Sequence, residues 1–505
     1  MTIAYLPNDP TAPAPLRQIK PSPDRPAGRA GFKVAKLPPE QVYPVDGPDY
    51  VAWGAREAAL RAVAAFEDCA GPLVGWQGKA ALKSLALIPD AGQQLNAYYD
   101  RASISFFDAV AAGKTIYSGA STDVVSHETG HAILDALRPD LWNTSLTEVA
   151  AFHEGFGDCI ALLTALSDKP IREALVKADP KMEKPNFVEA IAEALSAAIA
   201  AVYGPRHSAA KPRHALNDYR WDFPQNLPAD GPPGVLINEV HSLGQLLSGT
   251  YYRIIQGVFA RTKGGEAGLW EATRVATWLL ATAVAKAPVK ARFFQSVGRT
   301  MLIVDQAGYK GSNIPAIRAA YAHHNIDVGA STFLSPQMPL GPVASGFAAA
   351  GSNPLRAGGK ASLAVLLGAA ADAKVSFTRI EFGDRIVSRA SVAKAVDLSG
   401  LDPRLANAVA VTPQQAFVGP SGDEGGAAML GAADSAPAID AEVRSFVETL
   451  LRRDDIAFEP GAKGGGGFVA TKDSKTHALK GAKGEPVVLE RIAFACGCCR
   501  GKSRP

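Results

Sequence analysis

The strongest constraint on the fold is a long series of helical segments. From Thr122 to about Ile326, apolar residues recur every three or four positions. This spacing is typical of amphipathic helices, which must bury their apolar stripes against one another. A loop at about 204–235, rich in Pro, Asp, Asn and Trp, interrupts the series. The pattern predicts helices at 122–137, 146–166, 186–203, 237–261, 267–286, 289–305 and 313–323.

Shorter elements precede this series. A helix is predicted to begin near Asp49, where apolar residues again follow helical spacing. Alternating apolar and polar residues then predict strands at Ser84–Ile88, Ser103–Phe107 and Thr115–Tyr117. We therefore expect residues 48–328 to form one α+β unit.

The flanking segments differ from this unit in composition. Residues 1–47 are rich in Pro and charge, which predicts an extended arm that could be a removable prosegment. Residues 329–360 hold many Gly, Ser and Pro and predict a linker. Residues 361–505 predict a separate, small α+β accessory domain of unknown role, with a helix near 440–452 and a hairpin at 468–495.

Charge and hydropathy exclude two classes of partner. The chain has 52 Lys and Arg against 49 Asp and Glu, a net charge of +3, so we expect no nucleic-acid surface. The most apolar stretches, Ala190–Tyr203 and Thr277–Ala285, are shorter than the roughly 18–20 residues of a membrane helix. No signal peptide is visible at the N-terminus. We expect a cytoplasmic protein, or one exported by a signal-independent route.

The pentapeptide His127-Glu128-Thr129-Gly130-His131 is the motif that indicates a catalytic metal site. It falls within a predicted helix. Residues four apart share a helix face, so His127 and His131 can direct two imidazole nitrogens to one zinc ion. Glu128 lies beside the first of these ligands, where it can reach a water on the metal. Ser121 or Thr122 can cap this helix.

A third metal ligand is expected from the next helix. Glu148 fits a capping box that begins at Ser145, which accounts for it without a metal. Glu154 and Asp158 lie one turn apart in a strongly apolar helix and need partners there. Glu154 is predicted to bind zinc, while Asp158 accepts the free N–H of a ligand histidine. Gly155 and Gly157 lower helix propensity, and we expect them to let the two ligand-bearing helices approach closely.

The sequence resembles the thermolysin family of neutral zinc metallopeptidases over about residues 49–328. Ser121–Asp135 is similar to that family's zinc helix, including the acid at Asp135, and Glu154–Asp158 to its segment bearing the third ligand. The resemblance implies a two-lobed fold with a β-rich N-terminal lobe, a helical C-terminal lobe and one zinc ion in the cleft between them. Asp135 and Asp158 are then expected to support the ligand histidines.

The same resemblance implies the groups that handle the substrate. Asn96 and Ala97, in a segment similar to the family's substrate-binding edge, are expected to hold the peptide backbone. Arg213 is expected to bind a substrate carbonyl, although Arg206 and Arg220 are close by in the sequence. His241 matches the second catalytic histidine.

Some positions depart from the family's pattern. Trp142 stands where a tyrosine normally helps to stabilise the oxyanion, and its indole N–H could substitute. Leu236 stands where an acid orients the second histidine, so Asn238, Glu239 or Asp230 could serve instead. Ala165 replaces a calcium carboxylate, which makes a calcium requirement doubtful.

We therefore expect a metalloendopeptidase that cleaves peptide or protein substrates. Glu128 is the predicted general base, and His241, alone or with Trp142, the predicted oxyanion stabiliser. One alternative is a weak or inactive zinc-binding homologue that acts through its C-terminal domain. Another is a metal-handling or redox role for the crowded cysteines Cys496, Cys498 and Cys499.

Overall fold

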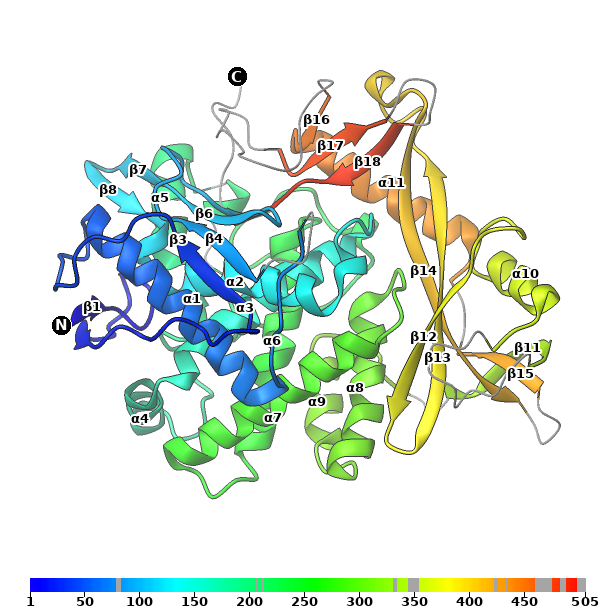
Figure 1. Cartoon of the computed structure of the whole chain (residues 1–505), viewed down its shortest axis with the longest axis horizontal. Helices are drawn as coiled ribbons and strands as arrows, with labels where there is room; N and C mark the ends of the chain where they lie inside the picture. Colours follow the sequence, from blue (N-terminus) through cyan, green and yellow to red (C-terminus); the bar gives the residue numbers. More distant parts are fainter. Residues whose placement is uncertain are drawn as a thin grey trace.

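The chain folds as an α+β protein, seen in the computed structural model of Figure 1. The structure describes residues 1–78, 83–205, 207–210, 213–329, 334–343, 354–421, 426–431, 434–458, 475–481 and 487–496. The helices are α1 (Pro48–Ala70), α2 (Thr122–Leu137), α3 (Thr147–Ser167), α4 (Lys169–Ala178), α5 (Glu193–Tyr203), α6 (Val240–Phe259), α7 (Gly265–Lys286), α8 (Phe293–Tyr309), α9 (Ile314–His323), α10 (Ala357–Leu366) and α11 (Ala436–Arg452).

Helix α3 is the centre of the helical part. It packs against α2 on one side and α6 on another, and its residues are apolar on almost every face. Among the described residues, α3 alone is long and apolar enough to cross a membrane, and it is wholly buried inside the protein. The composition of α3 is therefore typical of a core helix, which is covered by other elements on all its faces.

The predicted helices are confirmed with small shifts at their ends, apart from one. Within 186–203 the helix α5 begins only at Glu193, because Ala190–Ile191 forms strand β9, paired with β10 (Arg213–His214). Ala192 then takes a left-handed backbone conformation with φ of 56° before α5 begins. Helix α4 was not predicted from the sequence, because it is short and most of its residues outside the buried positions are polar.

A five-stranded mixed sheet lies next to the helices. Its strand order is β19-β5-β6-β4-β3. Its strands are β3 (Gly31–Val34), β4 (Ser84–Ile88), β5 (Ala97–Tyr99), β6 (Ser103–Phe106) and β19 (Phe494–Ala495). Strands β3, β4 and β6 run parallel, while β5 is antiparallel to both β6 and β19. The hairpin of β7 (Asp108–Ala111) and β8 (Lys114–Tyr117) follows.

Residues 1–47 are not a free arm. Strand β1 (Ile3–Tyr5) is buried and pairs with β2 (Arg17–Ile19), and β3 belongs to the five-stranded sheet. The buried carboxylate of Asp9 accepts a hydrogen bond from Ser121 Oγ at 2.9 Å. Ser121 is the N-cap of α2, so the N-terminal segment supports the start of the helix that carries the histidines. Its removal on maturation stays a prediction.

The C-terminal third packs against the helical part, although part of its sheet has a separate apolar core. An eight-stranded sheet contains β11 (Pro336–Pro342), β12 (Ser376–Phe382), β13 (Arg385–Asp397), β14 (Ala408–Ser421), β15 (Gly426–Leu430), β16 (Ile456–Ala457), β17 (His477–Lys480) and β18 (Val487–Arg491). Strand β11 lies within the predicted linker, and β17 with β18 forms the predicted hairpin. Helix α11 packs on α3, and buried residues such as Val443 and Phe494 belong to the same apolar cluster as Val124 and Phe152.

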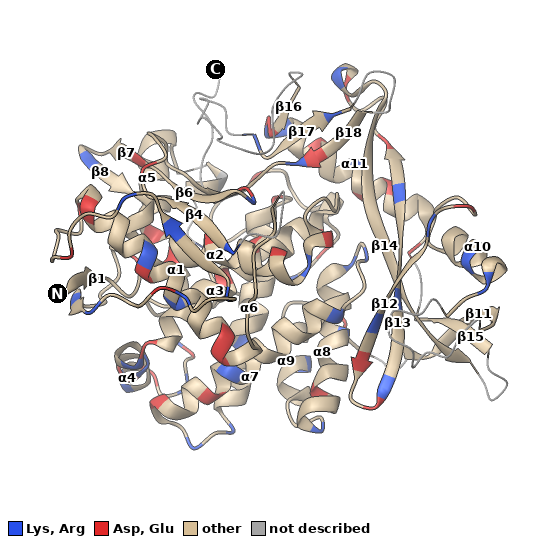
Figure 2. Ribbon diagram, viewed as in Figure 1, with Lys and Arg blue, Asp and Glu red and all other residues tan. Residues whose placement is uncertain are grey.

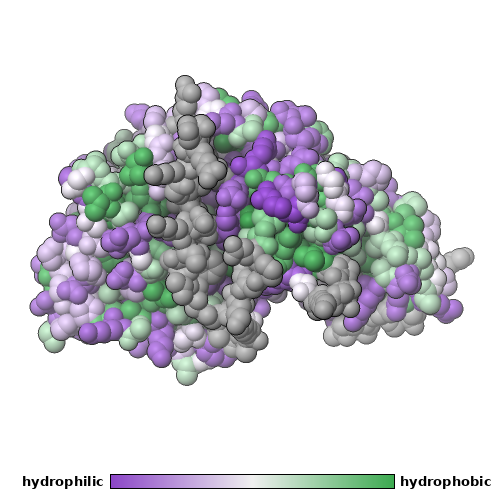
Figure 3. All heavy atoms as spheres, turned by 90° about the horizontal axis from the view of Figure 1, so that it is seen from above, coloured by the Kyte–Doolittle hydropathy of each residue, from purple (hydrophilic) through white to green (hydrophobic). Residues whose placement is uncertain are grey.

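Charges of both signs are spread over all parts of the fold (Figure 2). The face seen in Figure 3 likewise mixes hydrophilic and hydrophobic side chains.

Glycines set the distances between α2, α3 and α6. A Cβ on Gly130 of α2 would lie 2.8 Å from Gly157 Cα of α3. A Cβ on Gly155 would lie 2.4 Å from the carbonyl oxygen of Gly244 in α6. The expectation that both α3 glycines serve the α2 contact is thus wrong for Gly155, which admits the backbone of α6 instead.

We predict that Gly155→Ala destabilises the protein, because the added methyl group meets α6 backbone that cannot rotate away. The free energy of unfolding should fall by about 1–3 kcal/mol, as for other overpacked cores, although Ala is the better helix former. Gly358→Ala in α10 is the control, since a Cβ there meets no atom within 4 Å. Chemical denaturation of both variants checks the prediction, which an unchanged midpoint for Gly155→Ala would contradict.

Candidate metal centre

Three predicted metal ligands meet between α2 and α3. One ligand atom from each of His127, His131 and Glu154 lies within 4.8 Å of the other two, and all three residues are buried. Glu154 Oε2 is 3.3 Å from His127 Nε2 and 3.6 Å from His131 Nε2. The two histidines come from successive turns of α2, and the carboxylate comes from the facing side of α3.

These atoms fit a cation better than they fit one another. His127 Nε2, His131 Nε2 and Glu154 Oε2 are buried and find no hydrogen-bond partner among the described residues. A buried polar atom without a partner costs about 1–3 kcal/mol. A cation placed among two imidazole nitrogens and one carboxylate oxygen would satisfy all three. The cluster can therefore hold a metal ion.

Asp158 fixes the orientation of the first histidine. Its Oδ1 lies 2.8 Å from His127 Nδ1, which leaves Nε2 directed at the cluster. The same oxygen is 3.2 Å from Nη2 of Arg213. The ring of His127 is seated on Gly157, where a Cβ would come within 2.6 Å of Nδ1. Asp158 thus fixes the edge of the His127 ring by a hydrogen bond, and Gly157 packs against its face. Such contacts are typical of a histidine that binds a metal.

Glu128 lies beside the ligands with both carboxylate oxygens buried and without hydrogen-bond partners among the described residues. Burial raises the pKa of Glu128 to about 8, since the charged form is poorly solvated there. A cation bound at the neighbouring cluster would favour the ionised carboxylate of Glu128, which is the form that accepts a proton.

The structure resolves which acid orients His241. Glu239 Oε1 lies 2.7 Å from His241 Nδ1, while Glu239 Oε2 accepts from the Ser242 N–H and caps α6. His241 Nε2 is 3.1 Å from Glu154 Oε2. Burial lowers the pKa of His241, but the carboxylates of Glu154 and Glu239 outweigh burial and hold this pKa well above its usual value. Leu236 is buried and apolar.

Trp142 and Asp135 do not make the contacts that the sequence predicted. The single N–H of Trp142 donates to the carbonyl oxygen of Arg491 at 3.1 Å, so it is not available to an oxyanion here. Asp135 accepts from Tyr99 Oη at 2.9 Å and from Arg101 Nε at 2.8 Å. His131 Nδ1 has no hydrogen-bond partner among the described residues. Asp135 therefore ties α2 to β5 and its following turn instead of orienting a ligand.

Glu148 is also not the capping residue that the sequence suggested. The N-cap of α3 is Leu146, without a side-chain cap. Glu148 instead accepts from Arg292 Nη1 at 2.6 Å, Trp221 Nε1 at 3.0 Å and the Phe294 N–H at 3.1 Å. It stays outside the metal cluster, as expected.

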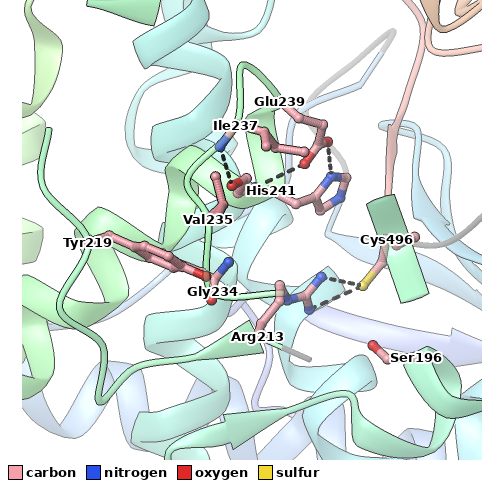
Figure 4. A pocket seen from close by; sticks show the side chains of 12 residues that line it. Ser196, Arg213, Tyr219, Gly234, Val235, Ile237, Glu239, His241 and Cys496 are labelled. Carbon is pink, nitrogen blue, oxygen red and sulfur yellow. Dashed lines mark hydrogen bonds and ion pairs between the residues drawn. The ribbon is translucent and has the colours of Figure 1, made fainter. Parts of the chain in front are cut away.

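The substrate-binding candidates lie around the same centre. Asn96 is buried and its Oδ1 accepts from the Ala97 N–H at 2.9 Å. Arg213 is buried beside Asp158, whereas Arg220 reaches the surface and Arg206 lies outside the described residues. A pocket beside His241 is lined by residues that include Arg213, Glu239 and Cys496 (Figure 4).

Sequence reasoning missed Cys496 at this centre. Ligand atoms of Cys496, His127 and Glu128 also lie within 4.8 Å of one another. Both terminal nitrogens of Arg213 point at Cys496 Sγ, each at 3.4 Å (Figure 4). The crowding of cysteines near the C-terminus was the only signal in the sequence, and Cys498 and Cys499 lie outside the described residues.

No protein-family model matches the chain, and no curated protein sequence matches it. Any functional conclusion therefore depends on the geometry of the site.

We predict that Asp158→Asn weakens metal binding by about 10–100-fold, the usual cost of losing a carboxylate behind a ligand histidine. The amide keeps the size of the side chain but removes the charge that steadies the His127 ring. Competition with a chelator of known affinity measures the change. Asp305→Asn is the control, because Asp305 is equally buried but bonds to Asn313 at the start of α9. Equal metal affinity in the two variants would contradict the prediction.

Proposed function

We propose that this protein is a zinc-dependent endopeptidase that hydrolyses peptide bonds. The observation that carries the proposal is the buried set of His127, His131 and Glu154, with unpaired ligand atoms and with Glu128 beside them. Two imidazoles and one carboxylate, with a fourth position for water, are a common donor set of catalytic zinc.

We further propose that the fold has the two-lobed arrangement of the thermolysin family. The helices from α2 to α9 would form one lobe, and the five-stranded sheet would belong to the other. The ligand helix α2 follows the strands β4–β8 directly in the chain. The Tyr99–Asp135 hydrogen bond joins the sheet to the helix that carries the two histidines.

The chain's own residues supply most of the proposed mechanism. When bound, zinc would act as a Lewis acid that polarises the substrate carbonyl and lowers the pKa of water towards about 7. Glu128 accepts a proton from the attacking water and later passes it to the leaving amine. A positioned general base of this kind contributes about 10²–10⁴-fold to the rate.

His241 donates from Nε2 to the oxygen on which negative charge develops. The Glu239–His241 hydrogen bond favours the protonated, correctly turned ring before the reaction begins. Loss of one such donor costs about 10²–10³-fold in kcat. Arg213, held by Asp158, is placed to bind a second carbonyl of the substrate.

A second candidate function is a zinc-binding protein with little or no peptidase turnover. The observation that favours it is the bond from Trp142 to Arg491, which removes one expected oxyanion donor. A quenched-peptide assay with and without a chelator distinguishes the two functions. Chelator-sensitive cleavage supports the endopeptidase, and profiling of cleaved sites in a digested proteome would define its substrates.

We predict that Glu128→Gln retains about one zinc per chain and loses nearly all hydrolysis, because an amide binds no proton at working pH. The rate should fall by about 10²–10⁴-fold. Metal analysis and peptide cleavage check the two parts of this prediction. Glu173→Gln is the control, since Glu173 is an exposed acid on α4 and should not affect either measurement. Cleavage at the parent rate by the Glu128→Gln protein would exclude the mechanism.

A further inference from the structure

The C-terminal segment occupies the free edge of the strand proposed to bind substrate. Strand β19 pairs antiparallel with β5, with Phe494 opposite Tyr99 and Ala495 opposite Tyr98. The N–H of Cys496 donates to the carbonyl oxygen of Ala97 at 2.9 Å. An extended peptide added to a sheet edge in this way is a common mode of substrate and inhibitor binding.

The side chains and carbonyl groups of this segment contact the catalytic candidates. The ring of Phe494 stacks on His131, with centroids 4.7 Å apart, and on His153, with centroids 4.1 Å apart. The carbonyl oxygen of Ala495 lies 3.1 Å from His241 Nε2. His241 thus already donates to a peptide carbonyl, the type of group that a substrate would offer.

Cys496 follows directly, and its sulfur lies in a second possible metal cluster, with His127 and Glu128, which shares His127 with the first cluster. It is buried, and its Sγ lies within 4.8 Å of a ring nitrogen of His127 and of a carboxylate oxygen of Glu128. Arg213 contacts this sulfur with both terminal nitrogens. The Nε2 atoms of His127 and His131, which are buried without hydrogen-bond partners among the described residues, are an independent observation in favour of a cation here. A buried sulfur beside such a group is a soft ligand suited to zinc.

We propose that Cys496 is a fourth protein ligand of the metal, and that residues 492–496 hold it there as an internal pseudo-substrate that keeps the enzyme latent. This inference rests on the proposed zinc site. Four protein ligands make a closed site, whereas catalysis needs an open position for water. The segment therefore blocks both the water position and the strand edge. Activity requires the segment to leave.

Strand β19 is short enough to detach from β5, although it blocks the site while it is bound. Strand β19 has only two residues, and short edge strands open locally at a low cost in free energy. Because the segment belongs to the same chain, its effective concentration is high, typically in the millimolar range. If the open form amounts to a tenth of the molecules, the apparent activity falls about tenfold.

The test uses the zinc-loaded full chain and X-ray absorption at the zinc edge. The parent should show one sulfur at about 2.3 Å from zinc, in addition to nitrogen and oxygen at about 2.0–2.2 Å. Cys496→Ser should bind the same amount of zinc and show nitrogen and oxygen only. The Cys69→Ser protein and the Cys498→Ser, Cys499→Ser double variant are the controls, and both should retain the sulfur.

Activity and thiol labelling provide a second readout. Cys496→Ser should cleave peptides about tenfold faster than the parent, and adding Glu128→Gln to it should abolish cleavage. In the unmutated chain, zinc should protect Cys496 from alkylation, as peptide mass spectrometry measures, while labelling of the half-buried Cys69 stays unchanged. This labelling needs no variant to fold.

The outcomes separate this inference from the proposed function. Zinc bound in the parent by nitrogen and oxygen alone, or equal Cys496 labelling with and without zinc, overturns the latency and leaves the peptidase site intact. Cleavage of the parent at the Ala495–Cys496 bond would also overturn it, because the segment would then be a substrate. Absence of bound zinc from parent and variant alike would overturn both proposals.

Discussion

The site depends on how closely α2 and α3 approach. Where the helices cross, Gly130 faces Gly157, and the ring of His127 lies on the Cα of Gly157. A methyl group on either glycine would force the helices apart and move an imidazole relative to Glu154. The contact costs helix propensity, about 1 kcal/mol for each glycine. It fixes three ligand atoms within 4.8 Å of one another on two rigid elements.

The same packing buries an unusual number of ionisable groups together. His127, His131, Glu128 and Glu154 are all shielded from water, and several of their atoms lack partners among the described residues. Such a cluster is unfavourable without a cation and favourable with one, so metal binding and stability of this region are coupled. Asp158 and Glu239 show how the surrounding residues limit the cost, since each holds one histidine ring in a fixed orientation.

Sequence patterns predicted the features that depend on residues close together in the chain. The bounds of α2 and β4, and the placement of His127 and His131 on one helix face, follow from short spacings within a helix or strand. The contact between Asp158 and His127 joins two helices and was expected because an acid in so apolar a helix needs a partner. Contacts between distant segments could not be found this way. Glu148 matched a capping box in sequence but bonds to Arg292 and Trp221, which lie far along the chain. Likewise, periodicity shows that Val443 and Phe494 are apolar, but not that they belong to one core with Val124 and Phe152 of the ligand-bearing helices.

The β5–β19 pairing has a consequence for how the protein folds. Phe494 and Tyr99 are separated by 395 positions in the chain (494 − 99), so closing this contact costs more configurational entropy than a local pairing does. Contacts of such long range form slowly and late. The metal cluster, built from residues 127–154, can assemble much earlier. Bringing the candidate ligands together therefore closes a much shorter loop than covering the sheet edge does.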